Sequence, residues 1–269
     1  MESPPSHDTN LVGLSADIAL PRLLEEHGDR LYGLSLKLCG HPADAEDLVQ
    51  EIFLIALRKW HQFQGDSHPT TWLYTIAARA CSRRRRKRSG EPRALESLNE
   101  LLPSPEDRIP DLSVMESPLD EQLRRETREA VERAIVSLPL HFRMPLVLKE
   151  IVELSIADVA AILGLKESTV KTRVHRGRLL LRRALSENLP LTEAPPPDHS
   201  RQMCLDLLYA KQESLDRGVP FEVDSEDLCL RCQSLFATLD LAKDTCHALG
   251  QGQMPEALRE ALEAAFAGS

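Results

Sequence analysis

Hydrophobic residues recur at helical spacing over most of this 269-residue chain. Between positions 20 and 38 they return mostly every three or four residues, and the same spacing reappears in 43–59. A loop at 61–70 interrupts the pattern, which resumes with the helix that starts near Trp72. The apolar–polar alternation of a half-buried strand is absent. The pattern predicts an all-α fold.

Two proline-rich segments divide this pattern. Residues 89–119 hold prolines among Ser, Glu and Asp, a composition that favours an extended, mobile tether. Residues 186–200 carry three consecutive prolines, as a stiff spacer does. We therefore expect three small helical modules, at 17–88, 120–185 and 201–269.

Charge is distributed unevenly along the chain, whose net charge is −9. Residues 186–269 hold 15 acidic and 6 basic residues, which leaves 27 of each sign in the rest. Within that neutral part, residues 83–88 are all basic, and 166–185 hold seven basic residues against one acidic. Two basic patches and an acidic C-terminal module predict contact with DNA at two places.

Several functional classes are not expected. No apolar run approaches the roughly 18–20 residues of a membrane span. The first ten residues lack the apolar core of a secretory signal, so we expect a cytoplasmic protein without a membrane partner. No nucleophile–base set, phosphate-binding loop or paired acid motif stands out, and an enzymatic function is not expected.

The helix predicted over 43–59 has a polar face that begins at Asp44. Such a face is most often simply solvated, and the alternative is a docking surface for a basic partner helix. Phe63 and Trp72 flank the loop that follows, close in sequence to the basic run. They are candidates for stacking on unpaired bases or for packing in the core.

The segment from Asp44 to Arg88 resembles region 2 of extracytoplasmic-function sigma factors. The acidic-Gln-Glu helix and the Thr-Trp-Leu start of the next helix match at matching spacing. The resemblance implies docking on the β′ clamp helices of core RNA polymerase through Asp47, Gln50 and Glu51. It also implies that the 61–70 loop and the next helix hold melted −10 promoter bases. The candidate −10 residues are Phe63, Trp72, Arg79, Arg83, Arg84 and Arg86, with Arg79 where the family often has Asn.

Residues 154–178 contain a helix-turn-helix pattern. Gly164 ends the first short helix, Ser155 and Ser168 are expected N-caps, and the second helix is basic. The N-terminal residues of such a recognition helix reach base edges in the major groove, whereas a plain helical hairpin is the alternative. The candidate DNA contacts, which the resemblance described next assigns to the −35 element, are Ser168, Thr169, Lys171, Thr172, Arg173, His175 and Arg176.

Together with residues 137–150, this pattern resembles region 4 of the same family. The resemblance implies recognition of the −35 element and contact with the polymerase β flap. Pro145 stands where family members usually have another residue, so we expect the upstream helix to begin or kink there. The rival interpretation is a helix-turn-helix regulator with a thiol redox switch and no role as a polymerase subunit.

The last module contains a cluster of cysteines. Cys229 and Cys232 form a CxxC, Cys204 lies 25 positions upstream, and Cys246 and His247 lie 14–15 positions downstream. Four thiolate or imidazole ligands suit a tetrahedral metal, and the soft thiolates accept Zn, Cu or Cd. We expect a site made of Cys204, Cys229, Cys232 and either Cys246 or His247, with His199 as a weaker candidate. Unliganded core or redox thiols are the alternative.

The same module resembles the zinc-binding anti-sigma domain. That domain places a His four residues before the first Cys of CxxC, a position held here by Ser225. The departure favours a different ligand set. Sigma factors with cysteine-rich C-terminal extensions are metal-responsive, which implies a sensor in cis and no separate anti-sigma protein. The sequence leaves open whether the module shields the basic helices or supports promoter binding.

Overall fold

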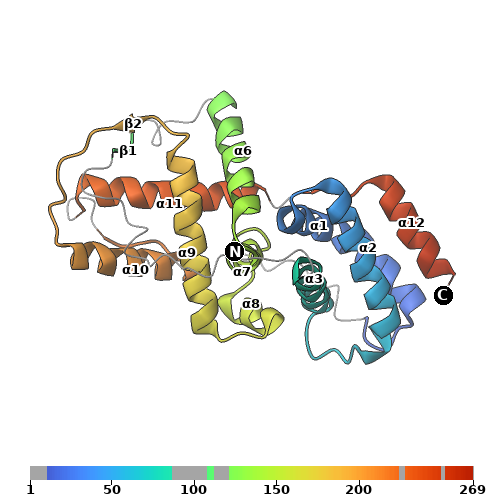
Figure 1. Ribbon diagram of the computed structural model, residues 1–269. Coiled ribbons are helices and arrows are strands. Elements are labelled where there is room, and N and C mark those ends of the chain that lie inside the picture. The colour runs from blue at the N-terminus through green and yellow to red at the C-terminus, as the bar shows by residue number, and fades with distance from the viewer. Residues whose placement is uncertain (1–10, 87–107, 112–120, 224–227, 250–251, 269) are drawn as a thin grey trace. The chain divides into compact units, whose positions relative to one another are not determined.

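The chain folds into two compact units of α-helices (Figure 1). This computed structural model describes residues 11–86, 108–111, 121–223, 228–249 and 252–268. Unit 1 comprises the described residues of 1–90, 158–165 and 250–269, and unit 2 those of 91–157 and 166–249. The predicted all-α class is confirmed, with one short β ladder. Among the described residues, no helix combines the length and apolar character needed to span a bilayer.

Three N-terminal helices form the body of unit 1, separated by short breaks. They are α1 (Ala16–Cys39), α2 (Pro42–Lys59) and α3 (Pro69–Arg86), with the 3-10 turn η2 (Trp60–Gln62) after α2. Gly40 ends α1 in the left-handed region at φ 81°, and its N–H donates to Leu36 O at 2.7 Å. Pro42 opens α2, where the missing N–H costs no helical bond. The apolar stripes of the three helices meet in a shared core.

The C-terminal helix α12 (Glu256–Ala267) belongs to the same unit and packs on α1 and α2. Leu258, Leu262 and Phe266, four residues apart, are all buried. The segment before the helix passes so close to α1 that a Cβ on Gly252 would lie 2.6 Å from the Gly33 Cα. The predicted module 201–269 is therefore divided, since its last helix is part of the N-terminal unit.

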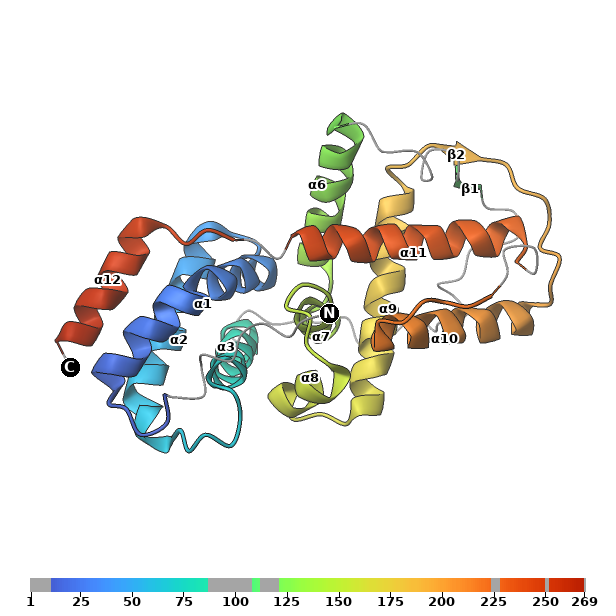
Figure 2. The same ribbon diagram turned by 180° about the vertical axis from the view of Figure 1, so that it is seen from behind.

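Unit 2 is arranged around the long helix α9 (Glu167–Ser186), which contacts α6, α7 and α11. These helices span Glu121–Ser137, Leu140–Glu150 and Leu230–Ala248 respectively. Figure 2 shows α11 running across α9 and α6. Pro145 lies inside α7, which begins at Leu140, so of the two expectations for this proline a helix start at Pro145 is wrong.

Arg143, in the first turn of α7, is a fully buried cation with 1% of its surface exposed. Its Nε donates to Leu138 O at 3.1 Å, and its terminal nitrogen donates to Leu138 O and Val136 O. The guanidinium therefore caps carbonyls at the C-terminal end of α6 that have no helical partner.

The helix-turn-helix segment consists of α8 (Ile156–Leu163), a turn and α9. Gly164 occupies the left-handed region at φ 64°, and the Leu165 N–H donates to Ala160 O at 3.0 Å. The predicted cap at Ser168 is wrong by two residues, because Lys166 is the N-cap and Ser168 lies in the first turn of α9. The Lys166 carbonyl accepts the first bonds from Thr169 and Val170.

Described parts of the two proline-rich segments pair with each other. β1 (Ile109–Pro110) and β2 (Leu191–Thr192) form an antiparallel ladder. On α11, Ser234 Oγ donates to Pro110 O at 2.9 Å, and Arg231 donates to Pro195 O at 2.8 Å. The spacer of 186–200 is thus fastened to α11; residues 87–107 and 112–120 lie outside the described part of the tether.

The helices α10 (Arg201–Arg217) and α11 run parallel. Near their starts, Cys204 Sγ lies 4.0 Å from Cys232 Sγ. Farther along, Lys211 Nζ lies 2.7 Å from Asp240. These two contacts, separated by similar numbers of residues on each helix, establish the shared direction.

Candidate nucleic-acid interface and thiol site

The predicted polymerase-binding residues lie on α2, where two of them, Glu51 and Asp47, contact arginines of α3. Arg83 and Arg84 donate to the two carboxylate oxygens of Glu51 at 2.9 and 2.8 Å. Arg84 also donates to Asp47 O at 2.9 Å. Gln50 is exposed, and the carboxylate of Asp47 is 69% exposed although it lies 3.9 Å from the Arg84 guanidinium. Part of the acidic face therefore holds the basic end of α3, and the rest faces outward.

Three aromatic rings form a cluster at the loop between α2 and α3. Trp60 stacks on Phe63 at a centroid distance of 5.1 Å, and Trp72 lies 5.8 Å from Trp60 in an edge contact. Trp60 is buried and donates its indole N–H to Leu14 O at 2.8 Å. Phe63 and Trp72 are half-buried, so each combines a packed edge with a surface open to a ligand.

The predicted −10 arginines differ in their surroundings. Arg79 is exposed, and Arg83 is 58% exposed despite its contact with Glu51. Arg84 is 34% exposed and carries most of the contacts to α2. Arg86 belongs to α3, but its side chain lies outside the described residues.

The predicted −35 residues occupy the first three turns of α9. Ser168 and Thr172 are exposed, while Thr169, Arg173 and Arg176 are half-buried. The other two, Lys171 and His175, are bound by carboxylates of α10. The structure therefore gathers all seven residues on one helix segment, with two of them already occupied.

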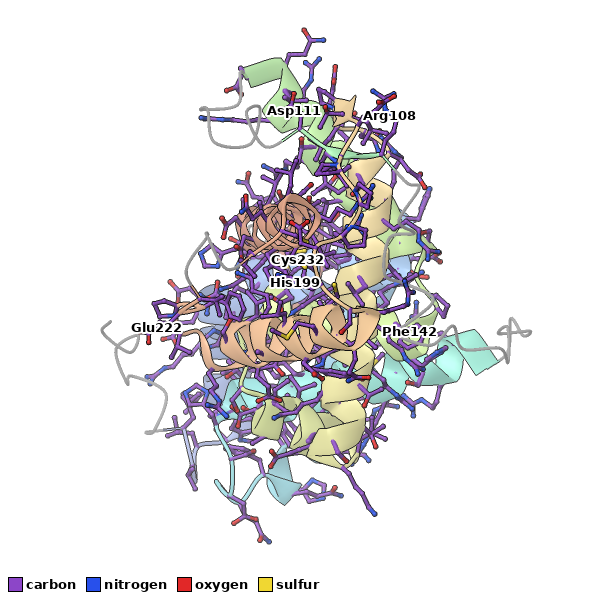
Figure 3. All side chains as sticks on the ribbon, turned by 90° about the vertical axis from the view of Figure 1, so that its left-hand side faces the viewer. Arg108, Asp111, Phe142, His199, Glu222 and Cys232 are labelled. Carbon is purple, nitrogen blue, oxygen red and sulfur yellow. The ribbon has the colours of Figure 1, made fainter. Side chains whose placement is uncertain are left out.

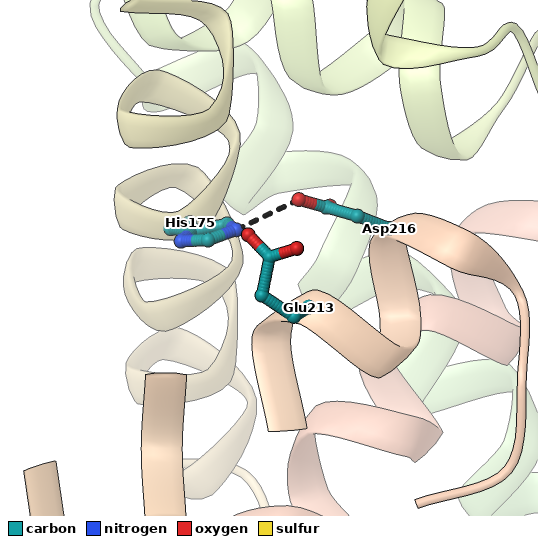
Figure 4. A group of neighbouring side chains, drawn as sticks. All are labelled: His175, Glu213 and Asp216. Atoms are coloured by element: carbon teal, nitrogen blue, oxygen red, sulfur yellow. Dashed lines mark hydrogen bonds and ion pairs between the residues drawn. The ribbon is translucent and has the colours of Figure 1, made fainter. Parts of the chain in front are cut away.

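Figure 4 shows the contact between α9 and α10. His175 Nε2 lies 2.9 Å from Asp216 Oδ2, and Lys171 Nζ lies 2.8 Å from Glu213 Oε1. Asp216 Oδ1 also lies 2.8 Å from the Arg178 guanidinium, which in turn contacts Glu150 at 2.6 Å. Burial acts to raise the pKa of Asp216, but the hydrogen bond from His175 and the charge of Arg178 outweigh it and lower the pKa.

His175, Glu213 and Asp216 lie close enough to hold a metal ion. Their carboxylates already have cationic partners, however, because Lys171 contacts both oxygens of Glu213 and Arg178 contacts Asp216. Adding a divalent cation would place three positive groups around two carboxylates. The cluster is an ion-pair network between two helices.

Three of the predicted metal ligands come together where α10 and α11 begin. Cys204 lies in the first turn of α10, Cys229 is the N-cap residue of α11, and Cys232 lies in the first turn of α11. Burial raises the pKa of Cys232, and the neighbouring thiols of Cys204 and Cys229 raise it further. Figure 3 labels Cys232 in this part of unit 2, together with His199, which precedes α10 by two residues.

An apolar cluster encloses the thiols. Leu208 of α10, Leu235 and Phe236 of α11 and Leu179 of α9 pack with Cys229 and Cys232. In these surroundings the Cys232 thiol, whose pKa is raised, keeps its proton until an electrophile or a soft metal displaces it. The donor set fits a thiophilic metal, and the helix start at Cys229 adds favourable N–H dipoles for thiolates.

Cys246 and His247 lie at the opposite end of α11. Fourteen residues of continuous helix separate Cys246 from Cys232, which is about 21 Å at about 1.5 Å per residue. Cys246 is fully buried, and His247 contacts Glu153. The structure therefore does not bring either residue to the other three cysteines.

The sequence analysis did not single out Glu213 and Asp216. It counted them only among the acidic residues of the C-terminal module. A usable signal was present in the spacing. Lys171, His175 and Arg178 fall on one face of α9, and the two carboxylates are three residues apart on α10.

Comparison with known proteins adds independent information. Residues 23–91 match the Sigma-70 region 2 model, and residues 128–181 match the Sigma-70 region 4 model. SigW of Bacillus subtilis, an ECF RNA polymerase sigma factor, is 31% identical over 175 residues, covering 63% of this chain and 90% of SigW. The chain belongs to the ECF sigma factor family. The resemblance of its two regions to regions 2 and 4 is thereby confirmed.

Two further similarities complete the comparison. The ECF sigma factor SigE of Mycolicibacterium smegmatis is 36% identical to the present chain over 168 residues. The present chain spans 61% of the length of SigE. The sigma factor RpoE of Bartonella quintana, solved in complex with the anti-sigma factor NepR, is 25% identical with a TM-score of 0.45. That match covers 62% of this chain and 96% of RpoE. Neither family match extends beyond residue 181, so the thiol site lies outside both.

Proposed function

We propose that this chain directs core RNA polymerase to a specific set of promoters. Unit 1 docks on the β′ clamp helices through the exposed part of α2 and holds −10 bases at the aromatic loop. The first turns of α9 read the −35 element, and region 4 also contacts the β flap. The observation that carries this assignment is the left-handed turn at Gly164 followed by a helix whose first turns present Ser168, Thr172 and Arg173.

The decisive experiment is transcription of sheared host genomic DNA by purified core polymerase, with this chain as the sole added factor. Mapping of the transcript 5′ ends should yield a shared pair of sequence elements upstream. A regulator that binds duplex DNA without polymerase gives no promoter-specific transcripts in this assay. It would also fail to co-elute with core polymerase, which separates the two interpretations.

Regulation in cis by a thiophilic metal is the second part of the proposal. The ligands are Cys204, Cys229 and Cys232, which converge at the starts of α10 and α11, with His199 as the fourth donor in place of Cys246 or His247. A bound Zn, Cu or Cd ion would supply a covalent link between the two helices. Metal analysis of the purified protein identifies which of these ions is bound.

Metal analysis of the reduced, purified protein tests this part. We expect Cys204→Ser and Cys232→Ser to lose the metal, whereas Cys246→Ser and Cys39→Ser keep it. Retention of metal by Cys232→Ser would contradict the ligand set. A metal-free protein that forms a disulfide under mild oxidation would instead support the thiol redox switch.

The prediction that no separate anti-sigma protein is needed has its own test. RpoE of Bartonella quintana was solved in complex with a separate anti-sigma factor, NepR. Affinity capture of the intact chain from its host, followed by transcription with and without the captured fraction, answers the question. A stoichiometric partner that blocks polymerase binding would contradict the prediction.

A further inference from the structure

Three basic side chains on one face of α9 are bound by a single helix of the C-terminal extension. Lys171, His175 and Arg178 follow one another at intervals of four and three residues, which places them on the same face of the helix. Glu213 binds the first, and Asp216 binds the other two. The basic face of α9 is therefore paired with an acidic face of α10 through several contacts.

Polar contacts to the backbone fix α10 in this position. Gln212 Nε2 donates to His175 O at 3.3 Å, and its side-chain oxygen accepts from Arg178 at 2.9 Å. Lys149 of α7 donates to Asp216 O at 3.1 Å. The end of α10 is therefore held to both α9 and α7 of unit 2.

Carboxylate oxygens at these distances make the same charge-assisted hydrogen bonds that phosphate oxygens of DNA would make. Lys171 and His175 cannot bind Glu213, Asp216 and a DNA strand at once. His175 is 5% exposed, so a duplex cannot reach its ring while α10 is in place.

We propose that α10 is an autoinhibitory cover that competes with DNA for the recognition helix. Glu213 and Asp216 stand in for phosphates, and α10 must leave α9 before α9 enters the major groove. The proposal rests on the function of α9 in promoter recognition and adds the element that controls it.

The charges of unit 2 allow the cover to open. Arg178 keeps Glu150 as a partner at 2.6 Å when Asp216 leaves, so no buried cation is left without a counter-charge. The Lys171–Glu213 pair is more than one-third exposed on both sides and holds the cover only weakly. α10 also carries Cys204 near its start, so metal binding or oxidation at the thiols acts on the same helix.

Binding of the full-length chain to DNA tests the cover directly. The probe is a labelled mixed-sequence duplex of about 30 base pairs, roughly three helical turns, measured by fluorescence anisotropy at about 50 mM salt. We expect Glu213→Gln to bind about threefold tighter than the wild type, and the double variant Glu213→Gln/Asp216→Asn about tenfold tighter.

The matched control is the double variant Asp206→Asn/Glu222→Gln. It removes the same charge from exposed positions on α10 and in the segment that follows it, and Asp206 accepts its hydrogen bond from Gln202 of α10 itself. We expect its affinity to stay within about twofold of the wild type, the size of a general charge effect. Equal tightening by the control and by Glu213→Gln/Asp216→Asn would overturn the proposal.

Chemical acetylation of Lys171, followed by mass spectrometry, gives a readout independent of DNA. Lys171 should be protected in the wild type and react several-fold faster in Glu213→Gln, whose half-exposed site tolerates the change without unfolding. Unchanged reactivity overturns the cover.

If the variants bind duplex more tightly but no chain supports promoter-specific transcription, the cover stands and the sigma function fails. If the wild type transcribes from specific promoters but the variants bind duplex no more tightly, the sigma function stands and the cover fails.

Discussion

The ring of Phe266 lies 5.8 Å from the ring of Phe53, joining the last helix of the chain to α2. Both side chains are buried, and Leu258 and Leu262 extend the same contact along α12. Arg259 reinforces it through Asp29 of α1 at 2.9 Å, and the Met254 N–H donates to the same carboxylate oxygen at 3.0 Å. The C-terminal helix is therefore a structural part of the region 2 unit.

We predict that Phe266→Ala destabilises unit 1 by about 3 kcal/mol, because it removes a buried aromatic ring and leaves a cavity beside Phe53. Urea unfolding followed by tryptophan fluorescence measures the change, since both tryptophans lie in this unit. Glu263→Ala, at an exposed position of α12, serves as the control and should shift the unfolding free energy by less than about 0.5 kcal/mol.

The acidic face of α2 should divide into binding and structural residues. Asp47→Ala and Gln50→Ala remove exposed groups, and the ion pair of Asp47 with Arg84 is long at 3.9 Å, so we expect weaker binding to core polymerase and a loss of stability below about 0.5 kcal/mol. Glu51→Gln breaks contacts with two arginines, and we expect it also to lower stability by about 1 kcal/mol. Polymerase co-elution and thermal unfolding, measured on the same three variants, separate the effects; a polymerase affinity unchanged in all three would contradict the predicted surface.

Metal binding at the thiols should strengthen as pH rises. Burial, together with Cys204 and Cys229, raises the pKa of Cys232, so its thiol is protonated at neutral pH and must lose that proton to become a ligand. Calorimetric titration with Zn in buffers of different ionisation enthalpy measures the released protons. Cys232→Ser should release fewer protons and bind more weakly, whereas Cys246→Ser should behave as the wild type. An affinity independent of pH would argue against thiolate ligands.

Arg173 and Lys171 should differ in their effect on promoter choice. Arg173 has the bidentate geometry that reads guanine, so we expect Arg173→Ala to relax −35 specificity at one position at a cost of about 1–3 kcal/mol. We expect Lys171→Ala to weaken binding to all sequences and to reduce the salt slope by about one. Selection from randomised duplexes, followed by salt titration, distinguishes the two roles. Loss of specificity on removing Lys171 would reverse the assignment.

The local features of the chain were predictable from sequence because they depend on neighbouring residues. Helical periodicity predicted the helices over 20–38 and 43–59 and the one that starts near Trp72, and Gly164 marked the turn before the recognition helix. The match to regions 2 and 4 followed from motif spacing, which the comparisons confirmed. The two-residue error at the Ser168 cap reflects the weak energetic preference among adjacent cap positions.

Contacts between distant segments were decided only by the tertiary structure. The stripe of Leu258, Leu262 and Phe266 shows that α12 must bury one face, but not that this face packs on α1 and α2. The cysteine spacing admits several ligand sets until a continuous α11 carries Cys246 away from Cys232. The net charge of the extension does not tell which carboxylate contacts which basic side chain. The packing of α10 on α9 brings Asp216 to His175. Burial drives each segment to find a partner, and only the complete fold determines which partner is within reach.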